Sequence, residues 1–462
     1  MSQISEIISA IDIGTTKIVA VIGKKEIDGK FRILGLGKAP SKGVKRGNVL
    51  NIEETVKSIK QALAIAEQKA NIKATDVFVG IAGQNIKCIR NSGYVNRASY
   101  EQEITQADVD CLLSDQHRIG LEPGEEILHV LPQSYTVDGE TGVNDPIGNC
   151  GKRLEGNFHI VIGKVVNINN LKKCVQRAGL TTNKLILEPL ASSHAVLTED
   201  EKEAGVVLID IGGGTTDLAI YYEGTICHTA VIPFGGNVLT SDVKAAYNIL
   251  ERYAEELKIQ YGSALAEVTS DNEVITVPGV SGREPKEISM KSLAHVVQAR
   301  MEEIIGAIEF QIENSGYADR LGAGIVLTGG GALLKNLPQL VAFKTGYEIR
   351  IGYPIQHLTS DVQEDVNQPM FSTSIGLMLM GYEEKLLKNE LINVNESFNS
   401  FEKEEMSSIT EVDIEDSFEE EEEEEPKPKT KPKKEKAEKT EKRPSKLKEL
   451  LGNIFDQTDT KM

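Results

Sequence analysis

The sequence has little cysteine and no surplus of basic residues. Its five cysteines stand singly along 462 residues, without the close pairs of a zinc site or the density of a secreted disulfide framework. The formal net charge is −19, and phosphate contacts with nucleic acid need a basic surface. We therefore expect reduced thiols and no nucleic-acid partner.

Long apolar runs are also missing. A run of about eighteen apolar residues, the length that marks a membrane-spanning helix, does not occur. The first residues, MSQISEIISAIDIG, lack the basic start of a secretory signal. We expect a cytoplasmic body. Predicted strands and helices alternate over residues 1–390, which indicates an α/β fold, and the length favours two or three domains.

Two common nucleotide-binding motifs are absent, because no GxxxxGK[ST] occurs and no GxGxxG opens a strand–helix–strand unit. The sequence has a repeated motif instead, AIDIGTTKIVAVIG from Ala10 and LIDIGGGTTDLAIY from Leu208. Each copy predicts a strand ending in an aspartate, a glycine turn and a second strand. One such turn is as often an ordinary hairpin. Two copies and a third glycine-rich segment, GIVLTGGGALLKNL from Gly324, favour a nucleotide site.

The chemistry of the repeated motif suits a triphosphate. Glycines let backbone N–H groups approach phosphate oxygens, and the threonine hydroxyls add donors. Lys17 supplies a positive charge, and Asp12 and Asp210 are predicted to hold Mg²⁺ through water. Two facing hairpins would then clamp the phosphates of ATP from both sides.

Periodicity predicts two long helices and an inserted unit. One helix begins after Asn51, which forms a capping box with Glu54, and the other spans about Ser289 to Asn314. Residues 84–165 form the predicted α/β insert. It begins with a polar strand pair, continues with a helix near 105–117, and ends with the strands EEILHVLPQSYTV and NFHIVIG.

The order DxGTTK, DxGGGTTD and GGGA resembles the actin, Hsp70 and sugar-kinase superfamily, whose fold has two ribonuclease-H-like lobes around an ATP cleft. Within it, KGVKRGNVLNIEETVKSIKQAL, LHVLPQSYTVDGETGVNDPIG and HTAVIPFGGNVLTSDV resemble the FtsA family of bacterial cell-division proteins. The similarity covers residues 5 to about 385. The resemblance implies an actin-like two-lobed ATPase fold, with the insert as subdomain 1C.

The resemblance also implies residue roles. The implied phosphate contacts are Gly14, Thr15, Thr16 and Lys17 in the first loop and Gly212, Gly213, Gly214 and Thr215 in the second. The implied adenosine contacts are Gly329, Gly330 and Gly331. Glu255 and Lys258 correspond to ribose and base contacts, with a solvated helical face as the alternative. Glu188 resembles the glutamate that orients the attacking water in related ATPases, although such a carboxylate can also act only through its charge.

Subdomain boundaries follow from the same resemblance. The implied ranges are 1–83, 166–198 and about 373–390 for subdomain 1A, 84–165 for 1C, 199–242 and about 302–372 for 2A, and 243–301 for 2B.

The C-terminal part changes in composition. Residues 402–425 hold 14 acidic side chains and one lysine, and residues 426–448 hold 11 Lys or Arg and three Glu. Such charge runs predict a disordered linker over 391–444. An amphipathic helix is predicted at 445–457, with Lys446 beside an apolar face. That face consists of Leu447, Leu450, Leu451, Ile454 and Phe455.

A C-terminal helix of this kind could dock on the protein's own body or on a partner, but in the resembling family it inserts into the membrane. The family implies an ATP-binding filament protein that acts as an adaptor rather than an enzyme, with at most slow ATP hydrolysis. It implies capture of the tubulin-like protein FtsZ by its C-terminal peptide at 2B, contacts of 1C with later division proteins, and a peripheral location on the cytoplasmic face of the cell membrane at the septum. The alternatives are a sugar kinase or chaperone ATPase of the same fold, and a related pilus-assembly adaptor.

Overall fold

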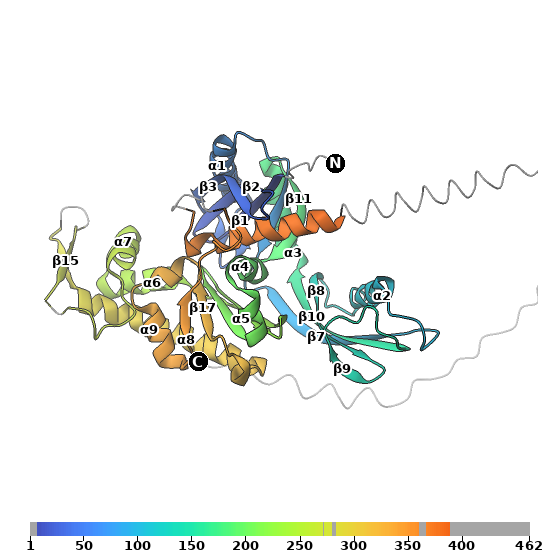
Figure 1. Ribbon diagram of the computed structural model, residues 1–462. Helices are drawn as coiled ribbons and strands as arrows, with labels where there is room; N and C mark the ends of the chain where they lie inside the picture. Colours follow the sequence, from blue (N-terminus) through green and yellow to red (C-terminus); the bar gives the residue numbers. More distant parts are fainter. Residues whose placement is uncertain (1–6, 271, 280–282, 360–365, 389–462) are drawn as a thin grey trace, which may run out of the picture. The chain divides into compact units, whose positions relative to one another are not determined.

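The computed structural model describes residues 7–270, 272–279, 283–359 and 366–388, all within one compact unit that ends at Glu396 (Figure 1). The linker and the amphipathic helix predicted for 391–444 and 445–457 lie outside the described residues.

A five-stranded mixed sheet forms the first lobe, in the order β11-β6-β1-β2-β3. Its strands are β1 (Ile7–Ile13), β2 (Lys17–Lys25), β3 (Phe31–Pro40), β6 (Asp76–Ile81) and β11 (Thr181–Leu187). The hairpin β1–β2 is antiparallel, whereas β6 runs parallel to β1 and to β11. Helices α1 (Ile52–Ala70) and α3 (Val165–Ala178) pack on one face of this sheet. A short hairpin, β4 (Val44–Lys45) and β5 (Asn48–Val49), precedes α1.

The second lobe repeats this topology. Its sheet has the order β14-β13-β12-β17-β18, with an antiparallel hairpin followed by parallel strands. Its strands are β12 (Val206–Ile211), β13 (Thr216–Tyr222), β14 (Thr225–Ile232), β17 (Ile325–Thr328) and β18 (Ile349–Ile351). The repeated sequence motif therefore marks a duplicated sheet, and the two motif turns lie at corresponding positions in the two lobes.

One hydrophobic core joins the inner faces of the two sheets. It contains Val19 and Val21 of the first sheet and Leu208 and Ala219 of the second, all at most 1% exposed. Helix α4 (Glu188–Val196) and the helical residues 372–388 also contribute to this core, and Figure 1 shows both between the sheets. Because the sheets share these helices, the two motif turns are fixed near each other.

The outer face of the second sheet is covered by helices. They are α6 (Gly236–Tyr247), α7 (Glu251–Tyr261), α8 (Met290–Ser315) and α9 (Leu337–Thr345), and they share a second core with the outward residues of β12 and β17. The short elements α5 (Glu199–Ala204), η2 (Ala318–Arg320), η3 (Gly330–Leu333), η4 (Pro369–Phe371), β15 (Val274–Val277) and β16 (Lys286–Ser289) complete this lobe.

Both long predicted helices are confirmed, and of the capping box predicted for the first, the bond to the Asn51 side chain is present. The side chain of Asn51 accepts a hydrogen bond from the Glu54 N–H at 3.2 Å and so starts α1. Helix α8 is capped at its start by Ser289, and it ends at Gly316, which has the left-handed backbone (φ 78°) that commonly ends helices. Among the described residues, no helix combines the length and apolar character needed to cross a membrane.

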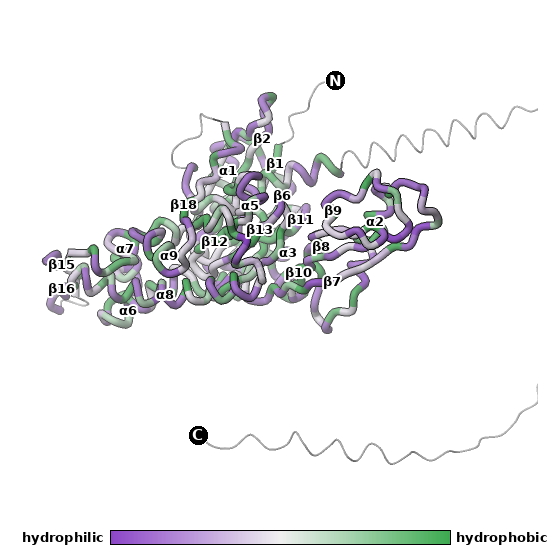
Figure 2. Tube along the Cα trace, turned by 60° about the horizontal axis from the view of Figure 1, so that its bottom comes forward, coloured by the Kyte–Doolittle hydropathy of each residue, from purple (hydrophilic) through white to green (hydrophobic). Residues whose placement is uncertain are grey.

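The insert is a separate four-stranded sheet with one helix, and its first part differs from prediction. The polar strand pair expected before the helix is wrong: one long strand, β7 (Ile86–Asn96), fills that segment. Ser92 and Gly93 form a turn-like pair in the sequence, but β7 continues through them because β10 (Arg153–Lys164) pairs along its whole length. The remaining elements are α2 (Gln106–Gln116), β8 (Glu125–Val137) and β9 (Glu140–Val143). Figure 2 shows that the loops around β9 are largely hydrophilic.

Candidate functional site

The turns of the two motifs touch each other. A Cβ atom placed on Gly214 would lie 2.4 Å from Thr15 Oγ1 and 2.8 Å from Thr15 Cβ, and one on Gly213 would lie 1.8 Å from Thr16 Oγ1. Side chains at these two positions would overlap with the facing threonines. The structure therefore brings the two predicted phosphate loops together as facing β-turns, and the glycines permit this approach.

Four carboxyl groups gather where β1 and β12 end. Asp12 and Asp210 lie one residue before the ends of these strands, Asp217 lies opposite Asp210 on β13, and Glu188 begins α4. Burial raises the pKa of Asp12 to about 6, against the lowering effect of Lys17. Burial and the neighbouring Asp210 raise the pKa of Asp217 to about 8. The surroundings thus do not stabilise the cluster with all four carboxyl groups ionised.

Asp210 is positioned by the helices of the shared core. Its Oδ2 atom accepts hydrogen bonds from Ser192 at 2.7 Å and from Thr373 at 3.1 Å. Burial raises the pKa of Asp210, while these two hydroxyls and Lys17 lower it. Residues far apart in sequence therefore fix this carboxylate.

The cluster suits a hydrated divalent cation. Asp217 Oδ2 accepts a hydrogen bond from Thr215 at 3.0 Å, whereas its buried Oδ1 has no partner in the described part of the chain. Carboxylate oxygens are the ligands that Mg²⁺ prefers, usually together with water. The part of the chain that the structure describes contains no group of three or more His, Cys, Asp or Glu that could hold a metal ion. The Mg²⁺ contacts of Asp12 and Asp210 therefore remain predictions.

Glu188 lies beside this cluster. Burial, followed by the charges of Asp12, Asp217 and Asp210, raises its pKa well above the ordinary range. A carboxyl group that holds its proton cannot accept another from water. The role of Glu188 as an orienting group for water stays a prediction that requires the local charge to change.

A pocket of about 520 Å³ adjoins the two turns. Eight residues predicted from the sequence line it: Thr16, Lys17, Gly212, Gly213, Glu255, Lys258, Gly330 and Gly331. Gly14, Thr15, Gly214 and Thr215 belong to the turns but lie outside this lining, and Gly329 packs against Asp210 and Ile211. The volume falls in the usual range for small-molecule sites, about 300–1,000 Å³.

Glu255 and Lys258 do not form a solvated helical face. Lys258 Nζ bonds Glu255 Oε2 at 2.7 Å, the Gly236 carbonyl at 3.1 Å and Thr240 Oγ1 at 3.0 Å. Its side chain is 14% exposed. The pair therefore ties α7 to α6 and lies on the pocket wall.

Several lining residues were missed from the sequence. The same pocket is also lined by Asn237 and Leu239 on α6, Ile259 on α7, Met301 on α8, and Leu334, Lys38, Lys335 and Met370. They come from elements that have no shared motif, so only the fold assembles them. Asp217 could have been found, because DIGGGTTD carries a second aspartate where the first motif has Val19.

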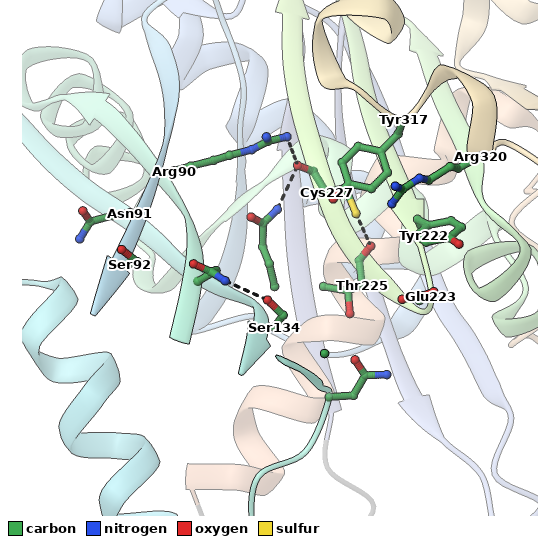
Figure 3. Close-up of a pocket in the computed structure, with 14 residues that line it drawn as sticks. Arg90, Asn91, Ser92, Ser134, Tyr222, Glu223, Thr225, Cys227, Tyr317 and Arg320 are labelled. Atoms are coloured by element: carbon green, nitrogen blue, oxygen red, sulfur yellow. Dashed lines mark hydrogen bonds between the residues drawn. The ribbon is translucent and has the colours of Figure 1, made fainter. Parts of the chain in front are cut away.

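A second pocket of about 530 Å³ lies between the insert and the second lobe (Figure 3). Arg90 of β7 donates to the carbonyl of Ser315 at 3.1 Å, and Gln133 of β8 donates to the carbonyl of Cys227 at 3.0 Å. On the opposite wall, the Arg320 guanidinium lies over the rings of Tyr222 and Tyr317. This pocket is lined mainly by polar side chains.

The duplicated sheets, the facing turns and the shared helices define the class: this is an actin-like two-lobed protein with an inserted subdomain. Among solved structures, the PilM-PilN type IV pilus biogenesis complex has a similar fold, with a TM-score of 0.59 at 16% identity over 81% of this chain and 98% of that one.

Sequence comparison specifies the family. Residues 207–376 match the family model "Cell division protein FtsA", and residues 83–162 match "SHS2 domain inserted in FTSA". The chain is 41% identical to the cell division protein FtsA of Pseudomonas aeruginosa over 83% of this chain and 91% of that protein. It is 36% identical to that of Escherichia coli K12 over 82% and 91%. The chain belongs to the FtsA family of cell division proteins.

Asp217→Asn tests the charge imbalance. The Asp217 pKa is about 8 in the fold and about 3.9 in an unfolded chain. Since the folded pKa is the higher one, the protonated carboxyl contributes stability that is fully present below about pH 4 and is lost as the pH rises towards 8. We expect the variant to raise the Tm of nucleotide-free protein more at pH 8 than at pH 5.

Thermal unfolding in the absence of Mg²⁺ measures this difference. Asp110→Asn, a change of an exposed aspartate on α2, is the matched control and should leave the Tm difference between the two pH values unchanged. An equal effect of Asp217→Asn at both pH values would contradict the raised pKa.

Proposed function

We propose that this member of the FtsA family binds ATP with Mg²⁺ between the facing turns and in the adjoining pocket. The observation that carries the proposal is the contact of Gly213 and Gly214 with Thr16 and Thr15, which places backbone and hydroxyl donors from both lobes around one position. The membership of the family supports it, because the sequence resemblance implied the same ligand.

The roles of the site residues follow from their chemistry. Lys17 offers positive charge to the phosphates, and Asp12 and Asp210 hold Mg²⁺ through water. Glu255, Lys258, Gly330 and Gly331 border the ribose and base. When bound, Mg²⁺ neutralises charge on both the phosphates and the carboxyl cluster. We propose slow hydrolysis at most, with Glu188 orienting water once that charge is neutralised.

We further propose that nucleotide binding allows subunits to assemble into filaments that act as an adaptor for division. FtsZ would bind by its C-terminal peptide at residues 243–301, and later division proteins would bind at the insert. The alternative of a pilus-assembly adaptor has less support, because that likeness rests on 16% identity, against 41% to an FtsA. A sugar kinase or chaperone ATPase lacks support from the family match.

The C-terminal segment is proposed to bind the cytoplasmic face of the cell membrane at the septum. Leu447, Leu450, Leu451, Ile454 and Phe455 supply an apolar face, and Lys446 adds about 1 kcal/mol towards anionic lipid. With no tryptophan in the chain, one helix would bind weakly. Assembly compensates, because linked sites can exceed single-site affinity by about 10² to 10⁴.

Gly214→Ala tests nucleotide binding. The added methyl group would lie 2.4 to 2.8 Å from three atoms of Thr15 and would push the two turns apart. We expect the affinity for ATP with Mg²⁺, measured by calorimetric titration, to fall about tenfold or more, or about 1.4 kcal/mol. Gly306→Ala is the matched control, because its Cβ meets nothing within 4 Å. Unchanged affinity in Gly214→Ala, or no ATP binding by the unaltered protein, would overturn the proposal.

Charge reversal on the insert tests the partner surface. Arg90 lines the pocket in Figure 3, whereas Arg118 lies on the same insert outside that pocket. We expect Arg90→Glu to weaken co-precipitation of later division proteins and to leave binding of the FtsZ peptide unchanged, because that peptide is assigned to 243–301. Equal losses in Arg90→Glu and Arg118→Glu would argue against this surface.

Leu451→Glu tests the membrane segment. A charge on the apolar face of a helix opposes its burial in lipid, so we expect less protein to sediment with anionic vesicles while ATP binding persists. Asn453→Glu adds the same charge off the predicted apolar face and should have a smaller effect. Full vesicle binding by Leu451→Glu would reject the assignment.

A further inference from the structure

Three asparagines meet at the base of the insert. The side-chain oxygen of Asn48, in the β4–β5 hairpin, accepts hydrogen bonds from Asn85 at 3.1 Å and from Asn167 at 3.0 Å. Asn85 directly precedes β7, and Asn167 lies in the first turn of α3, which follows β10. One side chain therefore holds both connections through which the insert joins the first lobe.

The same hairpin contacts the first phosphate loop. The Gly47 N–H donates to Thr15 Oγ1 at 3.1 Å, which leaves the Thr15 hydroxyl hydrogen available for another acceptor. Gly47 has a left-handed backbone (φ 74°), and a Cβ there would lie 2.7 Å from Gly83 Cα. The hairpin is thus packed between the phosphate loop and the start of the insert.

Asn48 is suited to transmit a displacement. It is 9% exposed, its oxygen accepts two hydrogen bonds, and its amide donates to the Arg46 carbonyl at 3.4 Å. Breaking a buried amide pair leaves polar groups unsatisfied at a cost of about 1–3 kcal/mol. Separating Asn85 or Asn167 from Asn48 is therefore unfavourable.

A small cavity lies between the asparagines and Glu188 of the candidate nucleotide site. Asn48, Asn85, Asn167 and Glu188 all line a cavity of about 20 Å³, and a volume of about 10–15 Å³ is enough for one water molecule with polar partners. The asparagine cluster and Glu188 thus line one small cavity, whose other lining residues are mostly apolar.

The insert also contacts the second lobe. Thr229 of β14 bonds both Cys88 of β7 and His159 of β10 at 2.9 Å. The β12–β13 turn is tied to the end of β14 by the Thr216 hydroxyl, which donates to the Phe234 carbonyl at 2.9 Å. A change in the angle of the insert therefore alters its contact with the lobe that carries the other phosphate loop.

We propose that Asn48 is a positioning residue that couples occupancy of the phosphate site to the orientation of the insert. A phosphate oxygen that accepts from Thr15 polarises the Gly47 bond and strengthens it, which fixes the hairpin and, through Asn48, both connections of the insert. This inference rests on the proposed nucleotide binding. Coupling is reciprocal, so a protein bound to the insert changes nucleotide affinity by the same factor.

Hydrogen–deuterium exchange of the full chain, with and without a nonhydrolysable ATP analogue and Mg²⁺, tests the coupling. In the unaltered protein we expect the analogue to slow exchange in the phosphate loops and, by about fivefold, in residues 84–96 and 153–164. In Asn48→Ala we expect the loops to remain protected by the analogue while the effect on the insert disappears. Asn167→Ala removes one donor at a partly exposed helix start, so it provides a second variant should Asn48→Ala fail to fold.

Asn91→Ala is the matched control. The Asn91 amide also donates to a side-chain amide, that of Gln116, at 2.7 Å, but both residues lie within the insert. Loss of this hydrogen bond should leave the response to the analogue intact. A full response of the insert in Asn48→Ala or in Asn167→Ala, or no response in the unaltered protein despite protected loops, would overturn the coupling. Absence of protection at the loops themselves would instead reject nucleotide binding, and the coupling with it.

Discussion

The glycines of the second motif turn lie so close to Thr15 and Thr16 of the first that they leave no room for side chains of their own at the point of contact. This approach constrains the rest of the molecule, because two separate lobes would not hold it unaided. The inner faces of both sheets therefore pack on the same helices, α4 and residues 372–388. Those helices supply Ser192 and Thr373, the two hydroxyls that bond Asp210. The element that joins the lobes thus also orients a carboxylate between them.

The same approach concentrates negative charge. Asp12, Asp210, Asp217 and Glu188 are buried together, and Lys17 lowers the pKa values of Asp12, Asp210 and Glu188 against the effect of burial. Burying carboxyl groups with so little compensation favours their protonated forms. A cation bound beside them, as proposed, would offset the charge of their ionised forms and so stabilise the site.

The sequence was sufficient for parts of the molecule that depend on local rules. The caps of α1 and α8, and the two motif hairpins, follow from asparagine, serine and glycine at defined positions. The prediction for the insert was wrong at β7. This strand pairs with β10, which lies far away in sequence, so no local signal distinguishes it from a short hairpin. The pocket wall made by Met301, Ile259 and Leu334 was missed for the same reason. From the sequence alone, each of these apolar residues is predicted to lie in the core. Only the fold shows that it lines the pocket together with the glycines.

Long-range polar bonds are the least predictable feature, and they carry the connections between parts. Asn48, Asn85 and Asn167 stand in unrelated segments, and nothing in the pattern of any one segment marks it as a partner of the others. Buried amides require such partners, however, so their meeting restricts how the insert can sit on its lobe. A hydrophobic base would hold the insert equally well but would tolerate sliding. The directional bonds from Gly47 to Thr15, and from Asn85 and Asn167 to Asn48, would convert a change at the phosphate loop into a defined change in the angle of the insert, which apolar packing alone would absorb.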